Sequence, residues 1–517
     1  MLPLPRAAKP PCARLKASSH GPSRPLGCRT IPARMLEFSP CGCGCRARSS
    51  FGTERQRHPA PGRISRKLRD QPMHRASLSD MSSLSTRVLA ASAGRDRVSD
   101  GVKALALALV ILGHGLAWTI TPDGSAVNTL EAAPWLFPLT WLLQILPLFF
   151  LVAGERIASL AARPTTDGLQ RRAVRLVTPT IPLLLVTLLA AAVIPSFAGE
   201  AVASGAGVIP VQLLWFLGIY LAAIAMSPLL ARLRKPWHFG VMLLAIAAVD
   251  LLRVHVWEPA GWANLLLAWL FFVALGMHLP RLRLVPRRLL AVGLMIALAA
   301  AVGLVIAGPY SAALISTDAL PGISNLAPPT MVLVLAGIAQ VMVLLLAWPG
   351  LSRLLARDRV WVPVALFSSR AMGMYLLHML LLALCVGVVM AAGLRPIALS
   401  LGWWALHALV LAIIVGLAWV LTPALMKSGS GSAALVARLI PGGAAAKLRG
   451  GPVSLWLALT ALAGLCLLMI SESGLAAALH VRPVLGIPYL PVAAVVILML
   501  VAALASKPAR HDIRDGF

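Results

Sequence analysis

Apolar segments about twenty residues long recur from residue 101 onward, and they constrain the fold more than any other feature. An α-helix rises about 1.5 Å per residue, so such a segment crosses a hydrocarbon layer about 30 Å thick. With 59% hydrophobic and 12% charged residues, the chain has too many apolar side chains for a soluble protein to bury. The sequence therefore predicts an all-α, polytopic transmembrane bundle with twelve spans, at 101–121, 135–161, 176–197, 208–231, 238–254, 262–280, 287–308, 327–348, 364–392, 399–422, 453–470 and 486–505.

The net charge of +28 could suggest a nucleic-acid-binding protein, but the basic residues are distributed as membrane topology requires. They are concentrated in the N-terminal arm and in every second loop between the predicted spans. The intervening loops are poor in Lys and Arg and contain Asp123, Glu131, Glu200, Glu258, Asp318 and Glu472. The positive-inside rule then predicts a multi-pass plasma (inner) membrane protein with both termini in the cytoplasm. We expect the lipid bilayer, and no nucleic acid, as a partner.

Residues 1–95 are rich in Arg, Pro, Ser and Gly and are predicted to be a disordered basic arm. Met73 and Met81 both precede sequence that resembles a normal cytoplasmic lead-in, so we hypothesise that one of them is the true start or that the arm is dispensable. Three closely spaced cysteines at 41–45 lack the paired spacing and the histidines of a zinc site. We therefore expect no metal.

Lys103 and His114 lie in the first predicted span, eleven residues apart. At about 100° and 1.5 Å per residue they share one helix face and are separated by about 16 Å. An ionisable group inside a bilayer is costly, which makes His114 a functional candidate, and imidazole is suited to remove a proton from a hydroxyl group. Lys103 lies at the predicted cytoplasmic boundary, where its side chain could also simply extend into the headgroup region.

Several motifs, taken in order, resemble the acyltransferase 3 family of integral membrane acyltransferases, including its actinobacterial-type members. The family's first helix has Asp-Gly-x-Arg and then, after ten residues, a His, and this pattern resembles Asp100–His114. The other matching segments are Leu146–Gly154, Arg171–Pro179, Leu214–Leu217, Asn325–Pro329 and Met374–His378. Two positions depart from the family pattern: Lys103 replaces an Arg, and Glu155 stands where an aromatic residue is usual.

The resemblance implies a ten-helix acyltransferase domain at 98–425. It leaves a cytoplasmic loop at 426–452, two additional transmembrane helices at 453–505 and a cytoplasmic tail at 506–517. It also implies O-acetylation or another acyl transfer, from cytoplasmic acyl-CoA to a hydroxyl group. The expected acceptor is a cell-envelope glycan, a glycolipid or a secondary metabolite, so that polysaccharide modification is one of the activities implied. Acyl-CoA, most simply acetyl-CoA, would be a co-substrate, and no bound cofactor is expected.

In that reaction His114 would be the general base, and Lys103, Arg172 and Arg175 would bind the phosphates of the donor. The alternative for the two arginines is ordinary positive-inside charge. Glu155 is the second catalytic candidate, because it could orient or balance the charge of Lys103 or His114. Equally, Glu155 and Arg156 could pair with neighbouring charges as structural ions. Both a covalent acyl-histidine intermediate and direct transfer are compatible with this set of residues.

Three further residues are cavity candidates: Trp215, Tyr375 and His378. The alternative for Trp215 is interfacial packing, and the alternative for His378 is a hydrogen-bonded packing histidine.

A second class of function is a secondary transporter or exporter that couples to protons through His114, Glu155 and Arg156. Twelve spans with both termini inside also suit a transporter. The halves of the sequence show no internal repeat, which favours the enzyme.

Overall fold

The computed structural model describes residues 86–196, 205–317, 319–484 and 486–506. The hypothesis of a start at Met73 or Met81, the cysteines at 41–45 and most of the predicted tail lie outside these residues. The first half of the described chain contains α2 (Arg97–Leu116), β1 (Trp118–Ile120), β2 (Ala126–Asn128), α3 (Thr129–Ala132), α4 (Phe137–Leu143), α5 (Leu146–Ala162), α6 (Thr166–Val177), α7 (Thr180–Val193), α9 (Leu214–Ala225), α10 (Ser227–Leu230) and α11 (Pro236–His255). The second half contains α12 (Ala263–Gly276), α13 (Leu279–Leu282), α14 (Arg287–Ala307), α15 (Met331–Leu355), α16 (Asp358–Ala391), α17 (Leu401–Leu439), α18 (Gly442–Arg449), α19 (Val453–Ser473), β3 (Arg482–Val484), β4 (Ile487–Tyr489) and α20 (Pro491–Ala505). Two short 3-10 helices lie at Pro134–Leu136 and Glu258–Trp262.

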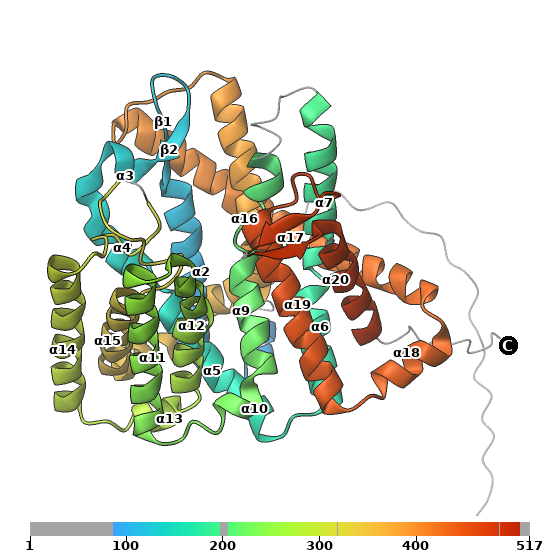
Figure 1. Cartoon of the computed structure of the whole chain (residues 1–517), viewed down its shortest axis with the longest axis horizontal. Coiled ribbons are helices and arrows are strands. Elements are labelled where there is room, and N and C mark those ends of the chain that lie inside the picture. Colours follow the sequence, from blue (N-terminus) through green and yellow to red (C-terminus); the bar gives the residue numbers. More distant parts are fainter. Residues whose placement is uncertain (1–85, 197–204, 318, 485, 507–517) are drawn as a thin grey trace, which may run out of the picture. The chain divides into compact units, whose positions relative to one another are not determined.

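The described chain is a helical bundle, which confirms the predicted fold class (Figure 1). Within the described ranges, ten helices are long and apolar enough to cross a membrane. The other two predicted spans correspond to the shorter apolar helices α9 and α20. Each of the twelve predicted spans therefore overlaps an observed helix.

Successive long helices run in opposite directions and define two ends of the bundle. We call the end with the basic loops, such as those after α5 and α13, the basic end. The hairpins β1–β2 and β3–β4 follow helices α2 and α19, which both rise from the basic end, and we call the opposite end the hairpin end (Figure 1).

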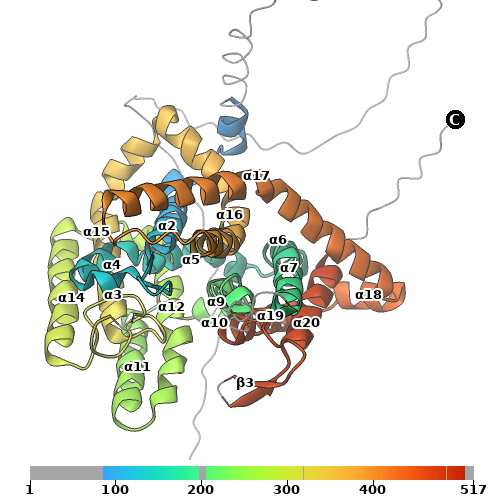
Figure 2. The same ribbon diagram turned by 90° about the horizontal axis from the view of Figure 1, so that it is seen from above.

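Two boundaries predicted from the sequence differ from the structure. Residues 86–95, assigned to the disordered arm, are described and pack on the bundle: Trp361 Nε1 donates a hydrogen bond to Ser92 Oγ (2.9 Å). The predicted loop at 426–452 is mostly helical, because α17 continues to Leu439 and α18 follows at Gly442. The 39-residue α17 crosses the bundle obliquely along one side (Figure 2). This helix is longer than the thickness of the hydrocarbon layer. Hydropathy alone does not indicate either the end of the predicted arm or the end of α17.

Glycine allows the closest helix contacts. A Cβ atom on Gly276 of α12 would lie 1.8 Å from the carbonyl oxygen of Leu151 in α5, and one on Gly154 of α5 would lie 2.1 Å from that of Val273. Gly218 of α9 and Gly464 of α19 meet in the same way, since a Cβ on either would lie within 3 Å of the other's carbonyl oxygen. Small residues at crossings are typical of helices packed in a membrane. The C-terminal helices are therefore packed directly on the core.

The hairpin β1–β2 is attached to α17 through a buried histidine. The His407 ring stacks on Trp403 at 3.7 Å between centroids and lies 4.3 Å from the Trp118 ring. Its Nδ1 and Nε2 lie 2.8 Å and 3.0 Å from the carbonyl oxygens of Trp403 and Trp118. Arg395 also donates a hydrogen bond to the carbonyl of Pro122 in the β1–β2 turn. His407 is thus part of the packing that fixes the chain just after His114.

The segment between α14 and α15 is held by buried polar residues. Asn325 donates to the carbonyl oxygens of Ser311 (2.6 Å) and Ala313 (2.8 Å). Asp250 of α11 accepts from the backbone N–H of Met331 (2.7 Å) and from the Tyr310 hydroxyl (3.2 Å). Burial of the phenol, and then the negative charge of Asp250, raise the pKa of Tyr310 above its ordinary value.

Candidate functional site

A cavity of about 1770 Å³ extends through the bundle from the basic end to the hairpin end. Its wall at the basic end includes Lys103 and Arg175, and its wall at the hairpin end includes Trp404 and Ile487. His114 lies on the wall between them. Lys103 and His114, the two ionisable residues of the first predicted span, therefore line the same cavity.

His114 lies in the last turn of α2, on the same cavity-facing side as Lys103, Leu107 and Val110. Its Nδ1 donates a hydrogen bond to the carbonyl oxygen of Val110, one turn earlier, at 2.8 Å. A carbonyl oxygen can only accept, so the proton of the neutral ring is on Nδ1. The lone pair of Nε2 is then available to accept a proton.

His378 of α16 faces His114, with ring centroids 5.6 Å apart. Its Nδ1 lies 2.7 Å from the carbonyl oxygen of Tyr375 and 3.2 Å from that of Met374, which fixes the same tautomer as in His114. Its Nε2 is buried and has no hydrogen-bond partner among the described residues. A buried nitrogen without a partner is costly, and His378 lies next to His114 and Tyr375, which line the cavity, without being part of the lining itself.

Aromatic side chains form the cavity wall beside this histidine pair. Tyr375 donates from its hydroxyl to the carbonyl oxygen of Leu213 at 2.6 Å, which ties α16 to the start of α9. The Phe216 ring lies 5.5 Å from the Tyr375 ring and 4.7 Å from the Phe149 ring. Trp215 also lines the cavity and packs against Trp269 at 5.8 Å. The two histidines thus lie in an apolar environment, where the low dielectric constant strengthens polar interactions.

Asp100 organises the cations at the basic end. Its side chain is 5% exposed and lies 2.6 Å from Arg95, 3.7 Å from Lys103 and 3.6 Å from Arg156. All four residues line the cavity. One buried carboxylate cannot neutralise three cations, so the cluster remains positive and can bind an anion.

Arg172 and Arg175, one turn apart on α6, extend this cluster along the cavity wall. Arg172 Nη2 donates to the carbonyl oxygen of Arg156 at 3.4 Å. Their neighbour Arg171 is exposed and does not line the cavity. The helix period, rather than loop charge alone, directs two of the three arginines inward.

Glu155 takes part in a second ion-pair network, next to the cation cluster. Its Oε2 accepts from Ser99 Oγ at 2.7 Å, and its Oε1 accepts from Arg283 Nη2 at 3.0 Å. Arg283 also pairs with Asp96 at 3.0 Å and lies over the Trp348 ring at 3.7 Å. These contacts connect α2, α5 and α15 through Arg283 at the end of α13, and the Glu155 carboxylate also interacts electrostatically with Lys103.

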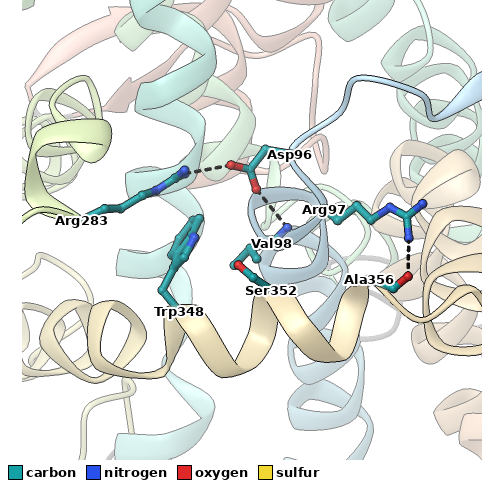
Figure 3. Close-up of a pocket in the computed structure, with 7 residues that line it drawn as sticks. All are labelled: Asp96, Arg97, Val98, Arg283, Trp348, Ser352 and Ala356. Atoms are coloured by element: carbon teal, nitrogen blue, oxygen red, sulfur yellow. Dashed lines mark hydrogen bonds and ion pairs between the residues drawn. The ribbon is translucent and has the colours of Figure 1, made fainter.

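A second cavity of about 480 Å³ lies beside this network (Figure 3). Figure 3 shows Arg283 reaching Asp96, while Asp96 also caps the start of α2 by accepting from the N–H of Val98. On the other side Arg97 donates to the carbonyl oxygen of Ala356 at 3.1 Å. The charged groups in this view are bonded to one another or to the backbone, so the network fixes the start of the helix that carries Lys103 and His114.

A family model for the acyltransferase domain matches residues 97–423, well over half of the chain. The chain belongs to the acyltransferase 3 family. It is therefore a membrane acyltransferase, and this membership does not favour the transporter alternative. Its sequence matches none of the curated proteins and its structure none of the solved structures with which it was compared.

Most of the site residues that the sequence predicts line one cavity of the acyltransferase. Its lining includes His114, Lys103, Arg172, Arg175, Trp215 and Tyr375. Two predicted residues are not part of this lining. His378 packs against the His114 ring, and Glu155 binds Ser99 and Arg283.

Sequence reasoning gave no role to Arg95 and Asp100. The sequence does not indicate a site residue at Arg95, because the segment around it has no apolar period. The signal that could have identified Asp100 is its position three residues before Lys103 in a predicted helix, where two opposite charges share one face.

Proposed function

We propose that this acyltransferase moves an acyl group, most simply acetyl, from cytoplasmic acyl-CoA to a hydroxyl group of a cell-envelope glycan, a glycolipid or a secondary metabolite. The observation that carries the proposal is that one cavity contains both the Asp100-centred cation cluster and the Nε2 side of His114. The basic end would face the cytoplasm of the plasma membrane, and both termini would be cytoplasmic.

The donor would bind with its phosphates at the basic end. CoA is strongly anionic, and Arg95, Lys103, Arg156, Arg172 and Arg175 offer charge-assisted hydrogen bonds there. Its long pantetheine arm would then extend along α2 toward His114. Lys103 and His114 are separated by about 16 Å along the helix, which suits an extended chain between the anionic group and the thioester.

His114 would act on the acceptor hydroxyl. Nε2 takes the hydroxyl proton while the oxygen attacks the thioester carbonyl carbon and forms the new ester bond. The C–S bond breaks, and the imidazolium returns its proton to the departing thiolate. The products are the acylated acceptor and CoA, and His114 is again neutral.

His378 would position the acceptor. Its unpartnered Nε2 can accept a hydrogen bond from a second hydroxyl group of the acceptor. Because a charged imidazolium repels another at this separation, only one of the two rings would be protonated at a time.

The test is transfer of label from [14C]acetyl-CoA in membranes with and without the protein. We expect label in an envelope glycan, lipid or small metabolite only when the protein is present. Absence of any protein-dependent transfer would contradict the proposal.

A further inference from the structure

The C-terminal segment outside the matched domain forms part of the same cavity. The lining includes Leu465, Leu468, Met469, Ser471 and Glu472 of α19, together with Val484 of β3 and Ile487 of β4. None of these residues falls within the region 97–423 that the family model covers. A wall built outside the shared domain can differ between family members without altering the histidine or the cation cluster.

One face of α19 is directed at this cavity. Residues 465, 468, 469 and 472 are spaced i, i+3, i+4 and i+7, so their side chains follow one line along the helix. The first three are apolar, and the last is a carboxylate with no ion pair or hydrogen bond to any described residue. Leu465 remains 52% exposed although its helix neighbours Gly464 and Leu468 pack against Gly218 of α9.

The packing that holds α19 in place does not depend on the exposed side chains of Leu465 and Glu472. The crossing of Gly218 and Gly464 fixes α19 against α9, and Trp456 and Leu467 are fully buried on other faces of α19. Leu465 therefore faces the open cavity, while Leu468 lines the cavity and also packs against Gly218 of α9. Exposure of apolar side chains to water is unfavourable, so this surface favours an apolar ligand.

The position of the wall identifies which substrate it serves. The α19 chain rises from the basic end, so Glu472 lies near the hairpin end, as does His114 in the last turn of α2. The anionic donor is drawn to the opposite end by the cation cluster, and a carboxylate would repel it. The wall on α19 and the β3–β4 hairpin is thus left to the acceptor.

We propose that α19 and the β3–β4 hairpin build the acceptor subsite of this enzyme and that the acceptor is an amphiphile. Its apolar body lies along Leu465, Leu468 and Met469, and a hydroxyl or ammonium group donates a hydrogen bond to Glu472. This inference rests on the proposed acyl transfer and specifies the acceptor class, an apolar molecule with hydroxyl groups in place of a free water-soluble sugar.

The first experiment supplies [14C]acetyl-CoA to membranes of the source cells that contain the full-length protein and partitions the products between butanol and water. We expect protein-dependent label in the butanol phase. Label in the water phase alone overturns the amphiphilic acceptor but leaves the acyltransferase activity. Absence of protein-dependent label in both phases overturns the proposed activity itself.

The second experiment compares Leu465→Trp with Leu462→Trp, using the butanol-extracted acceptor fraction as the titrated substrate. Leu462 is on the same helix, partly exposed and outside the cavity lining. Leu465→Trp should raise the apparent KM for the acceptor by about tenfold or more and leave the KM for acetyl-CoA unchanged, because it fills only the acceptor side. Glu472→Gln should change the same constant in the same direction. Equal acceptor KM values for the two Trp variants, or a rise in the KM for acetyl-CoA alone, would overturn the assignment.

Discussion

The imidazole rings of His114 and His378 lie 5.6 Å apart between centroids, and each donates from Nδ1 to a backbone carbonyl one turn earlier. Both Nε2 atoms are therefore acceptors in the neutral rings. Two helices that are far apart in the sequence, α2 and α16, thus place two histidines side by side, with His114 in the cavity wall and His378 buried next to it. A hydroxyl substrate in the cavity would meet His114 as the base for its reacting proton.

His378→Gln should lower kcat by about 10- to 100-fold while the KM for acetyl-CoA stays unchanged, because the group that positions the acceptor is altered and the donor site is intact. Steady-state kinetics with acetyl-CoA varied at fixed acceptor would measure this. A rise in the donor KM with normal kcat would place His378 in the donor site instead.

Arg172→Gln and Lys103→Gln should each raise the KM for acetyl-CoA by about tenfold, since each removes a charge-assisted hydrogen bond to phosphate. Arg171→Gln is the matched control, because Arg171 is adjacent, exposed and outside the cavity. If all three variants behaved alike, the two cations would be topological charges only. The contrast between variants and control should weaken as ionic strength rises.

Asp100→Asn should lower the thermal stability of the purified protein, by about 3 kcal/mol, because it leaves three clustered cations without their buried counter-ion. Asp358→Asn provides the control, since that carboxylate is 60% exposed and forms a long pair with Arg97. Melting curves in detergent would show the difference. Equal stability of the two variants would mean that Asp100 does not organise the cluster.

Gly276→Ala should destabilise the bundle by about 1–3 kcal/mol, since the added Cβ would lie 1.8 Å from the Leu151 carbonyl oxygen and force α5 and α12 apart. Gly240→Ala, with no atom within 4 Å of the added Cβ, should have no such effect. Yield of monodisperse protein and melting temperature would report the difference. Normal stability of Gly276→Ala would contradict the close helix crossing.

The spans could be predicted from the sequence because hydropathy and length report directly on what the bilayer permits. The place of His114 and Lys103 in a cavity wall could be predicted because a costly ionisable group in an apolar helix requires an explanation. The end of α17 could not, since a helix that leaves the membrane has no apolar signal to mark its boundary.

The partners of the charged residues were harder to predict. Glu155 could have paired with Lys103 or with another cation, and only the fold brings Arg283, 128 positions away, to its carboxylate. The place of α19 in the cavity wall could likewise not be predicted, because a cavity-facing apolar stripe and a lipid-facing one have the same composition. The tertiary arrangement decides between them.

The most direct test of the central claim is acyl transfer by His114→Gln in membranes, compared with His255→Gln. Gln keeps a polar side chain of similar reach but cannot accept the proton, and His255 is exposed at the end of α11, outside the cavity. We predict that His114→Gln loses about 10²- to 10⁴-fold in the rate of [14C]acetyl transfer while its expression and melting temperature match those of His255→Gln, which should retain full activity. Full activity of His114→Gln would contradict the assignment of His114 as the base.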